Sequence, residues 1–214
     1  MSVGVWISIG CVLVWGAQSA AADEPCVATV SLSASGVTGG SSLKGIVALN
    51  APAPSSGLAI RLSSSHPKAE VSGPIIAEPG QTLATFQIST APVAVSTAAT
   101  ITAATGACSA DTGVTLQPAV LAGLDLSVNA TRGNASLTGT VTLNGPAPAG
   151  GAVLKLQSSD PLVNVPASVT IPADQSSADF PITTGMALAP GSVALTATYG
   201  ASVHSALLTL VPGI

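Results

Sequence analysis

The 214-residue sequence contains little charge and very few aromatic side chains. Charged residues make up 7% of the chain, against about 25% in an average globular protein. Aromatic residues make up 2%. Five Lys and Arg residues against nine Asp and Glu residues give a net charge of −4, with no basic run. A nucleic-acid-binding protein needs a basic surface to neutralise phosphates, so we expect no nucleic-acid partner.

The residues that replace charge and aromatics are small, chiefly Ser, Thr, Ala and Gly. Such a composition raises the alternative of a disordered, low-complexity chain. Disordered segments are poor in aliphatic residues, however, and this chain has a mean hydropathy of +0.63. We therefore predict a folded protein.

The N-terminal segment has the order of an export signal. An apolar run over residues 3–15 precedes the small residues Ala20, Ala21 and Ala22. The run is short for a membrane-spanning helix, which needs about 20 residues, so residues 1–22 are predicted to be a signal peptide. No Lys or Arg precedes the run, which leaves an uncleaved anchor, or a lipoprotein acylated at Cys11, as alternatives. The expected location is secreted, periplasmic or on the cell surface.

The rest of the chain is a duplication. Residues 45–67 read GIVALNAPAPSSGLAIRLSSSHP, and residues 139–161, offset by 94 positions, read GTVTLNGPAPAGGAVLKLQSSDP. A unit of about 94 residues has the size of a β-sandwich. We predict two domains, repeat 1 over residues 23–117 and repeat 2 over residues 118–214. The link 117–119 is short and contains Pro118, so we expect a stiff, end-to-end connection.

Alternation of apolar and polar residues predicts strands and no helices. Residues 137–143 place Gly139 and Val141 on one face and threonines on the other. Similar patterns predict seven antiparallel strands per repeat, with a fourth that is short or broken around Pro166. Phe86 and Phe180 are the expected largest core residues. The fold class is therefore all-β, with two tandem seven-stranded β-sandwiches.

Removal of the signal peptide leaves two cysteines, Cys26 and Cys108, both in repeat 1. Their counterparts in repeat 2 are Val120 and Ser202. The first strand of a seven-stranded sandwich can lie parallel to the last, which places Cys26 beside Cys108. We predict a disulfide between them, with two buried thiols as the alternative.

The repeated motif resembles tandem immunoglobulin-like repeats of bacterial secreted and surface proteins. Its elements are G-x-V-x-L-x-x-P-A-P at residues 139–148, V-P-A-S-V-T-I-P-A at residues 165–173 and F-x-I-T-T at residues 180–184. The resemblance implies an immunoglobulin-like sandwich and a spacer or adhesion role, without catalytic residues. Repeat 1 departs from it at residues 72–77 and in its two cysteines.

The sequence offers no group of residues typical of catalysis, and we predict a protein that is not an enzyme. Nucleophilic catalysis needs a base beside the serine, and the two histidines, His66 and His204, belong to different repeats. The other repeat has Asp160 and Ala110 at these positions, so the repeat requires neither histidine. The acidic residues are scattered singly, and we predict no metal site and no cofactor.

We therefore expect a non-catalytic structural or adhesion module that acts as a spacer or protein-interaction surface. Its partner is an unknown protein or cell-envelope component, without stable membrane insertion after signal cleavage. Uncharged strands rich in Ser and Thr also permit self-association of sheet edges. The alternative is a carbohydrate or small-ligand binding module, in which Tyr199 would be a contact residue.

Overall fold

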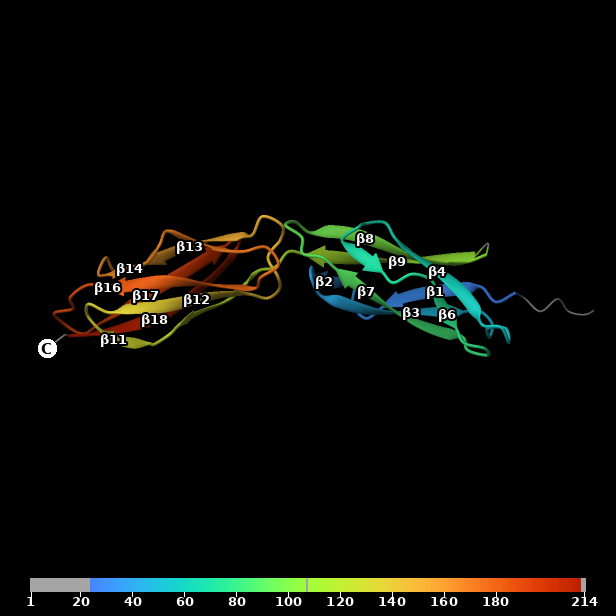
Figure 1. The fold of residues 1–214 in the computed structure, drawn as a ribbon, viewed down its shortest axis with the longest axis horizontal. Helices are drawn as coiled ribbons and strands as arrows, with labels where there is room; N and C mark the ends of the chain where they lie inside the picture. Colours follow the sequence, from blue (N-terminus) through green and yellow to red (C-terminus); the bar gives the residue numbers. More distant parts are fainter. Residues whose placement is uncertain (1–23, 107, 213–214) are drawn as a thin grey trace, which may run out of the picture.

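The computed structural model describes residues 24–106 and 108–212 and shows an all-β protein of two β-sandwiches joined end to end (Figure 1). This confirms the predicted fold class. The predicted signal peptide, residues 1–22, lies outside the described residues. Within those residues, no helix is long and apolar enough to cross a membrane.

Each repeat has the same nine short strands in its described part. Those of repeat 1 are β1 (Val27–Leu32), β2 (Gly36–Thr38), β3 (Ser42–Leu49), β4 (Leu58–Ser64), β5 (Ala69–Val71), β6 (Ile75–Ala77), β7 (Leu83–Thr90), β8 (Thr97–Thr105) and β9 (Cys108–Gln117). Those of repeat 2 are β10 (Leu121–Leu126), β11 (Ala130–Arg132), β12 (Ser136–Leu143), β13 (Ala152–Ser158), β14 (Val163–Asn164), β15 (Ser168–Ile171), β16 (Ser177–Thr184), β17 (Gly191–Tyr199) and β18 (Ser202–Val211).

The two sheets of each repeat have equivalent strand orders. In repeat 1 the orders are β1-β3-β7-β5 and β2-β9-β8-β4-β6; in repeat 2 they are β10-β12-β16-β14 and β11-β18-β17-β13-β15. Pairing is antiparallel except that β2 runs parallel to β9 and β11 parallel to β18. The predicted first strand of each repeat therefore lies beside the last strand, as expected. The contact is made by β2 and β11, which form the second half of that predicted first strand.

Two of the seven predicted strands are each divided between the two sheets of a sandwich. The first strand begins in the sheet of β12 as β10 and crosses to pair with β18 as β11. The fourth divides near Pro166: β14 pairs with β16, whereas β15 pairs with β13. Proline lacks the N–H that a continuous ladder needs, so the chain changes sheets there.

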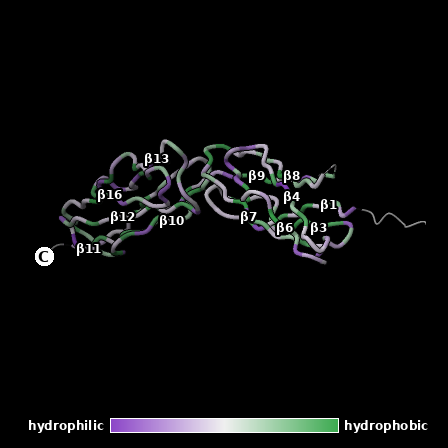
Figure 2. The backbone as a smooth tube through the Cα atoms, turned by 45° about the vertical axis from the view of Figure 1, so that its right-hand side comes forward, coloured by the Kyte–Doolittle hydropathy of each residue, from purple (hydrophilic) through white to green (hydrophobic). Residues whose placement is uncertain are grey.

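Each sandwich encloses its own hydrophobic core, and buried residues alternate with exposed ones along strands such as β3 and β7. Hydrophobic and hydrophilic residues are interspersed along the backbone of both sandwiches (Figure 2). Strand β3, for example, buries every second residue from Leu43 to Leu49. Phe86 and Phe180, the expected large core residues, are 5% and 2% exposed. Because the two cores contain different residues, each sandwich has its own source of hydrophobic stabilisation.

The sandwiches meet through loops rather than through a shared core. Residues 38–40, at the end of β2 and in the loop that follows, contact the loop after β12, residues 144–151. A side chain built on Gly40 would place its Cβ 2.2 Å from Pro146 Cγ, and one on Gly145 would place it 2.7 Å from Thr38 Cγ2. Both positions therefore require glycine for this approach of the two repeats.

Candidate functional site

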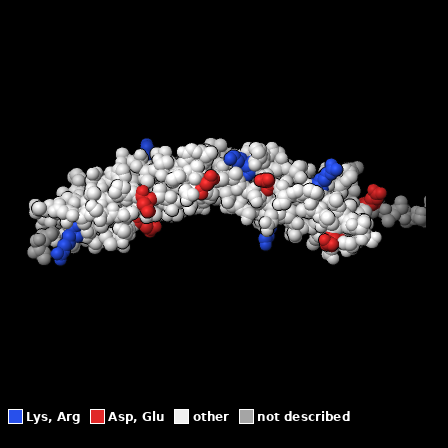
Figure 3. Space-filling view, in the orientation of Figure 1, with Lys and Arg blue, Asp and Glu red and all other residues white. Residues whose placement is uncertain are grey.

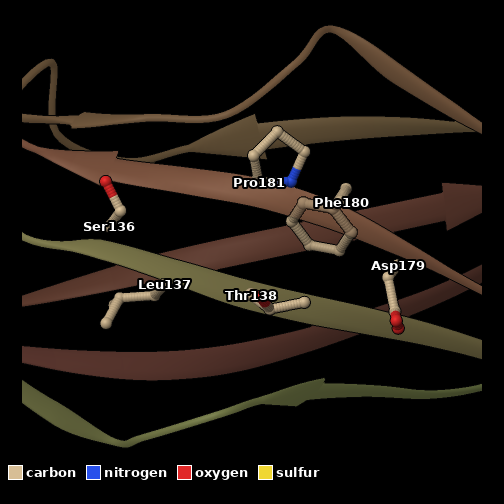
Figure 4. A pocket seen from close by; sticks show the side chains of 6 residues that line it. All are labelled: Ser136, Leu137, Thr138, Asp179, Phe180 and Pro181. Carbon is tan, nitrogen blue, oxygen red and sulfur yellow. The ribbon is translucent and has the colours of Figure 1, made fainter.

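A shallow hollow beside Phe180 is the first candidate for a binding or catalytic site. It has a volume of about 490 Å³. Ser136, Leu137 and Thr138 of β12 and Asp179, Phe180 and Pro181 of β16 line it, as Figure 4 shows. Its polar groups are two hydroxyls and one carboxylate, without a histidine, lysine or cysteine. The lining thus lacks the histidine of a Ser-His-Asp arrangement.

The carboxylate in this hollow is held by the neighbouring strand. The Thr140 hydroxyl donates a hydrogen bond to Asp179 Oδ1 over 2.7 Å. Asp125 faces Thr140 from the other side in the pairing of β10 with β12. Among the described residues, no three His, Cys, Asp or Glu side chains are grouped to hold a metal ion. The Thr140–Asp179 hydrogen bond strengthens the pairing of β12 with β16 on the outer face of the sheet.

The two histidines lie far apart in the fold and have different surroundings. His66 sits in the turn after β4, where its Nδ1 accepts a hydrogen bond from the backbone N–H of Lys68 over 3.1 Å. In repeat 2, Asp160 Oδ1 accepts the equivalent bond from Leu162 over 2.8 Å. His66 therefore performs the turn-forming role of Asp160. His204 is exposed on β18, opposite Ala197.

The structure joins Cys26 to Cys108 through a disulfide, with 5.6 Å between the two Cα atoms. Its surroundings are duplicated in repeat 2 without the sulfur atoms. Cys26 N–H donates to Asn50 Oδ1 over 2.7 Å, and Val120 N–H donates to Asn144 Oδ1 over 2.9 Å. The backbone therefore takes the same course at both sites, and the bridge is an addition specific to repeat 1.

Charged side chains are dispersed along the molecule. On the face shown in Figure 3, the described acidic and basic residues form no continuous area of one sign. Such a distribution gives no long-range electrostatic attraction for a charged ligand.

The aromatic side chains of the described residues belong to the cores. Phe86 and Phe180 are buried, and Tyr199 is half-buried against the core of repeat 2. Sugar-binding surfaces use exposed aromatic faces. Tyr199, the residue expected to contact a carbohydrate, therefore has a packing role.

The surface at which the repeats meet was missed by the sequence reasoning. A comparison of the two repeats at the 94-residue offset contains a signal for this surface. Each of the two glycines is present in one repeat only: Gly40 corresponds to Asn134, and Gly145 corresponds to Ala51. Burial reflects the contact: Pro148 is buried, whereas its counterpart Pro54 is exposed. Residues 38–40 and 144–148 together form the inter-repeat junction, in which Gly40 approaches Pro146 and Gly145 approaches Thr38.

Taken together, the strand order and the parallel pairing of first and last strands define an immunoglobulin-like sandwich, present twice in tandem. No protein-family model and no curated protein matches the chain. The comparison with solved structures gives the fold. Invasin, a bacterial integrin-binding protein, matches with a TM-score of 0.53 at 12% identity, over 86% of this chain and 39% of invasin.

Two further matches have lower scores. The D00-D0 domain of intimin matches with a TM-score of 0.39 at 14% identity, over 85% of this chain and 99% of that one. InvD of Yersinia pseudotuberculosis matches with a TM-score of 0.38 at 15% identity, over 86% and 57%. The resemblance to tandem immunoglobulin-like repeats of bacterial surface proteins is confirmed at the level of the fold.

Proposed function

We propose that the protein is a non-catalytic, rigid spacer of the cell surface or extracellular space, which holds a partner at a fixed distance and orientation. The observation that carries this proposal is the inter-repeat junction. A flexible linker would leave the two loops apart, whereas here Gly40 lies against Pro146 and Gly145 against Thr38. A spacer needs such a contact because two freely jointed domains do not keep their ends at a set distance.

The link between the repeats supports the same role. We propose that repeat 1 ends at Gln117 and repeat 2 begins at Pro118. Three residues, 118–120, lie between the end of β9 and the start of β10. Pro118 has a fixed φ, and a short connection with few rotatable bonds restricts the relative rotation of the sandwiches. Stiffness thus arises from both the covalent link and the contact beside it.

The proposed location outside the cytoplasm rests on the disulfide and on the N-terminal sequence. Disulfides persist in oxidising compartments and are rare in the cytosol. Residues 1–22 are proposed to be a cleaved signal peptide, which predicts a mature N-terminus at Asp23. Mass spectrometry of the protein recovered from cell fractions tests this, and a membrane-bound chain that retains Met1 would contradict it.

The proposed partner is a protein or another component of the cell envelope. Invasin is described as an integrin-binding protein. For this chain, the similarity to invasin supports an immunoglobulin-like fold that can present a protein-binding surface, and it does not identify the partner. Exposed edge strands, such as β6 with Ile76, permit pairing with another chain. The alternative of a carbohydrate-binding module gains no support, because the described aromatic rings pack into the cores.

The experiment that tests the spacer role measures the distribution of distances between a label in repeat 1 and a label in repeat 2. Single-molecule fluorescence energy transfer is suited to this. The native chain is expected to give one narrow distribution. Gly145→Ala introduces a Cβ against Thr38 and is expected to broaden it.

The matched control is Gly191→Ala, since a Cβ at Gly191 meets no atom within 4 Å. It is expected to leave the distribution unchanged. A broad distribution in the native chain would contradict the spacer proposal directly.

A further inference from the structure

We propose that the Cys26–Cys108 disulfide makes repeat 1 inextensible under tension while repeat 2 stays extensible. The oxidised chain, pulled from its two ends, then lengthens by one repeat only. The physiological use of this asymmetry rests on the proposed spacer function, but the mechanical property belongs to the chain itself. It follows from the path that tension takes through each sandwich.

In repeat 1, the tension bypasses nearly the whole domain. A pull on the N-terminal end reaches Cys26, passes through the disulfide to Cys108 and continues along β9 to Gln117. Strand β9 runs from the N-terminal end of the sandwich to the junction (Figure 1). A β-strand is already close to its fully extended length, at about 3.3 Å per residue. The covalent path across repeat 1 therefore has almost no length to gain.

The rest of repeat 1 lies outside this path. Cys26 and Cys108 are 82 positions apart in sequence, so the bridge shields eight of the nine strands from tension. Even if these strands came apart, the distance between the two ends of the repeat would change little.

In repeat 2, tension has no such bypass. Val120 and Ser202 stand where repeat 1 has cysteines. The tension must pass through every residue from β10 to β18, and only non-covalent interactions oppose it. One of these is the three-residue parallel pairing of β11 with β18, from Ala130 and Thr209 to Arg132 and Val211. Once these and the neighbouring strands separate, the whole domain unravels.

The two outcomes differ by an amount that single-molecule methods resolve easily. An extended chain spans up to about 3.3–3.6 Å per residue. Unfolding of repeat 2, roughly 90 residues, therefore adds on the order of 300 Å. Release of the residues between Cys26 and Cys108 adds on the order of 270 Å, but only after reduction.

The test is force spectroscopy of the chain held by its two ends, with the disulfide verified by mass spectrometry. The oxidised protein is expected to show one large extension step, and the same protein in a thiol reductant is expected to show two. Two large steps in the oxidised protein would overturn the proposal. This result requires no variant, so it stands even if removal of the cysteines prevents repeat 1 from folding.

A second variant moves the bridge to repeat 2. Val120→Cys with Ser202→Cys places two thiols at the positions in repeat 2 that correspond to Cys26 and Cys108. Asn144 forms the same two hydrogen bonds with the backbone of Val120 as Asn50 forms with the backbone of Cys26. The doubly bridged chain is expected to show no large step until it is reduced. A large step that persists with both bridges formed would also overturn the proposal. The spacer role is judged separately, by the inter-repeat distance distribution of the unloaded chain.

Discussion

The ring of Phe180 occupies the space over Gly139 that a side chain would need. A Cβ built on Gly139 would stand 2.3 Å from Phe180 Cζ, and the two residues are direct partners in the pairing of β12 with β16. Gly45 and Phe86 repeat this relationship in repeat 1, with 2.2 Å between the corresponding atoms. The largest core side chain of each sandwich thus depends on a glycine in the adjacent strand.

Gly139→Ala is therefore expected to lower the free energy of unfolding of repeat 2 by about 1–3 kcal/mol, the usual cost of overpacking a core. The methyl group forces the ring out of its position over β12. Chemical denaturation followed through Tyr199 fluorescence measures this, because Tyr199 is the sole tyrosine of the chain and lies in repeat 2. Gly191→Ala, in open space on β17, is the control. Equal stability of the two variants would contradict the account.

Reduction of the disulfide is expected to destabilise repeat 1 alone. A bridge that closes a loop of 82 residues restricts the unfolded chain, and the chain-entropy model gives about 4–5 kcal/mol for its loss. Circular dichroism, which reports on both repeats, should show an earlier unfolding transition in the presence of a thiol reductant. The Tyr199 signal should not shift, and a shift of that signal would show that the stabilities of the two repeats are coupled.

Thr184 is a buried polar residue on which the start of β12 depends. Its hydroxyl accepts a hydrogen bond from the backbone N–H of Ala135 over 2.9 Å. In repeat 1 its counterpart Thr90 accepts a hydrogen bond from the N–H of Gly40, one position earlier in the repeat, over 3.1 Å. Thr184→Val keeps the shape of the side chain but leaves this N–H without its partner. A loss of about 1–3 kcal/mol in the free energy of unfolding is expected. Thr183→Val, on the exposed face of the same strand, should cost far less in the same denaturation experiment.

His66 stabilises the turn after β4, and this structural role can be tested by substitution. His66→Ala removes the acceptor for the Lys68 N–H and is expected to lower the stability of repeat 1 by about 0.5–1.5 kcal/mol. His66→Asp should retain the native stability, since Asp160 makes the same bond in repeat 2. A clearly lower free energy of unfolding for His66→Asp than for the native protein, measured by thermal or chemical unfolding, would contradict the proposal that His66 and Asp160 have the same role.

The residues at the two outer faces of the repeat pair explain why the inter-repeat junction is specific to one pair of surfaces. At the C-terminal end of repeat 2, Asn134 stands where Gly40 permits contact, and at the N-terminal end of repeat 1, Ala51 stands where Gly145 does. A second molecule placed in the geometry of the junction would meet these two side chains. We therefore expect no head-to-tail stacking of that geometry, which sedimentation of the concentrated protein would detect.

The duplicated sequence by itself determined that the chain is all-β and that it contains two sandwiches, because alternating burial and turn residues are local patterns. It also indicated the inward positions of Val141, Phe86 and Phe180, which the structure buries. Cys26 and Cys108 were found from the sequence as well, through their number and their absence from repeat 2. The proposed signal peptide and domain boundaries remain predictions from the same patterns.

The break of the fourth strand around Pro166 was predicted from the sequence. Only the tertiary structure decided which strands share a sheet, where the first strand divides, and how the repeats touch. These features depend on contacts between residues distant in sequence, and no local period encodes such contacts. The packing of Phe180 over Gly139 and the contact of Gly40 with Pro146 both join residues that are distant in sequence. A glycine in the sequence shows only that a side chain is absent, whereas the folded chain shows which atoms use the space.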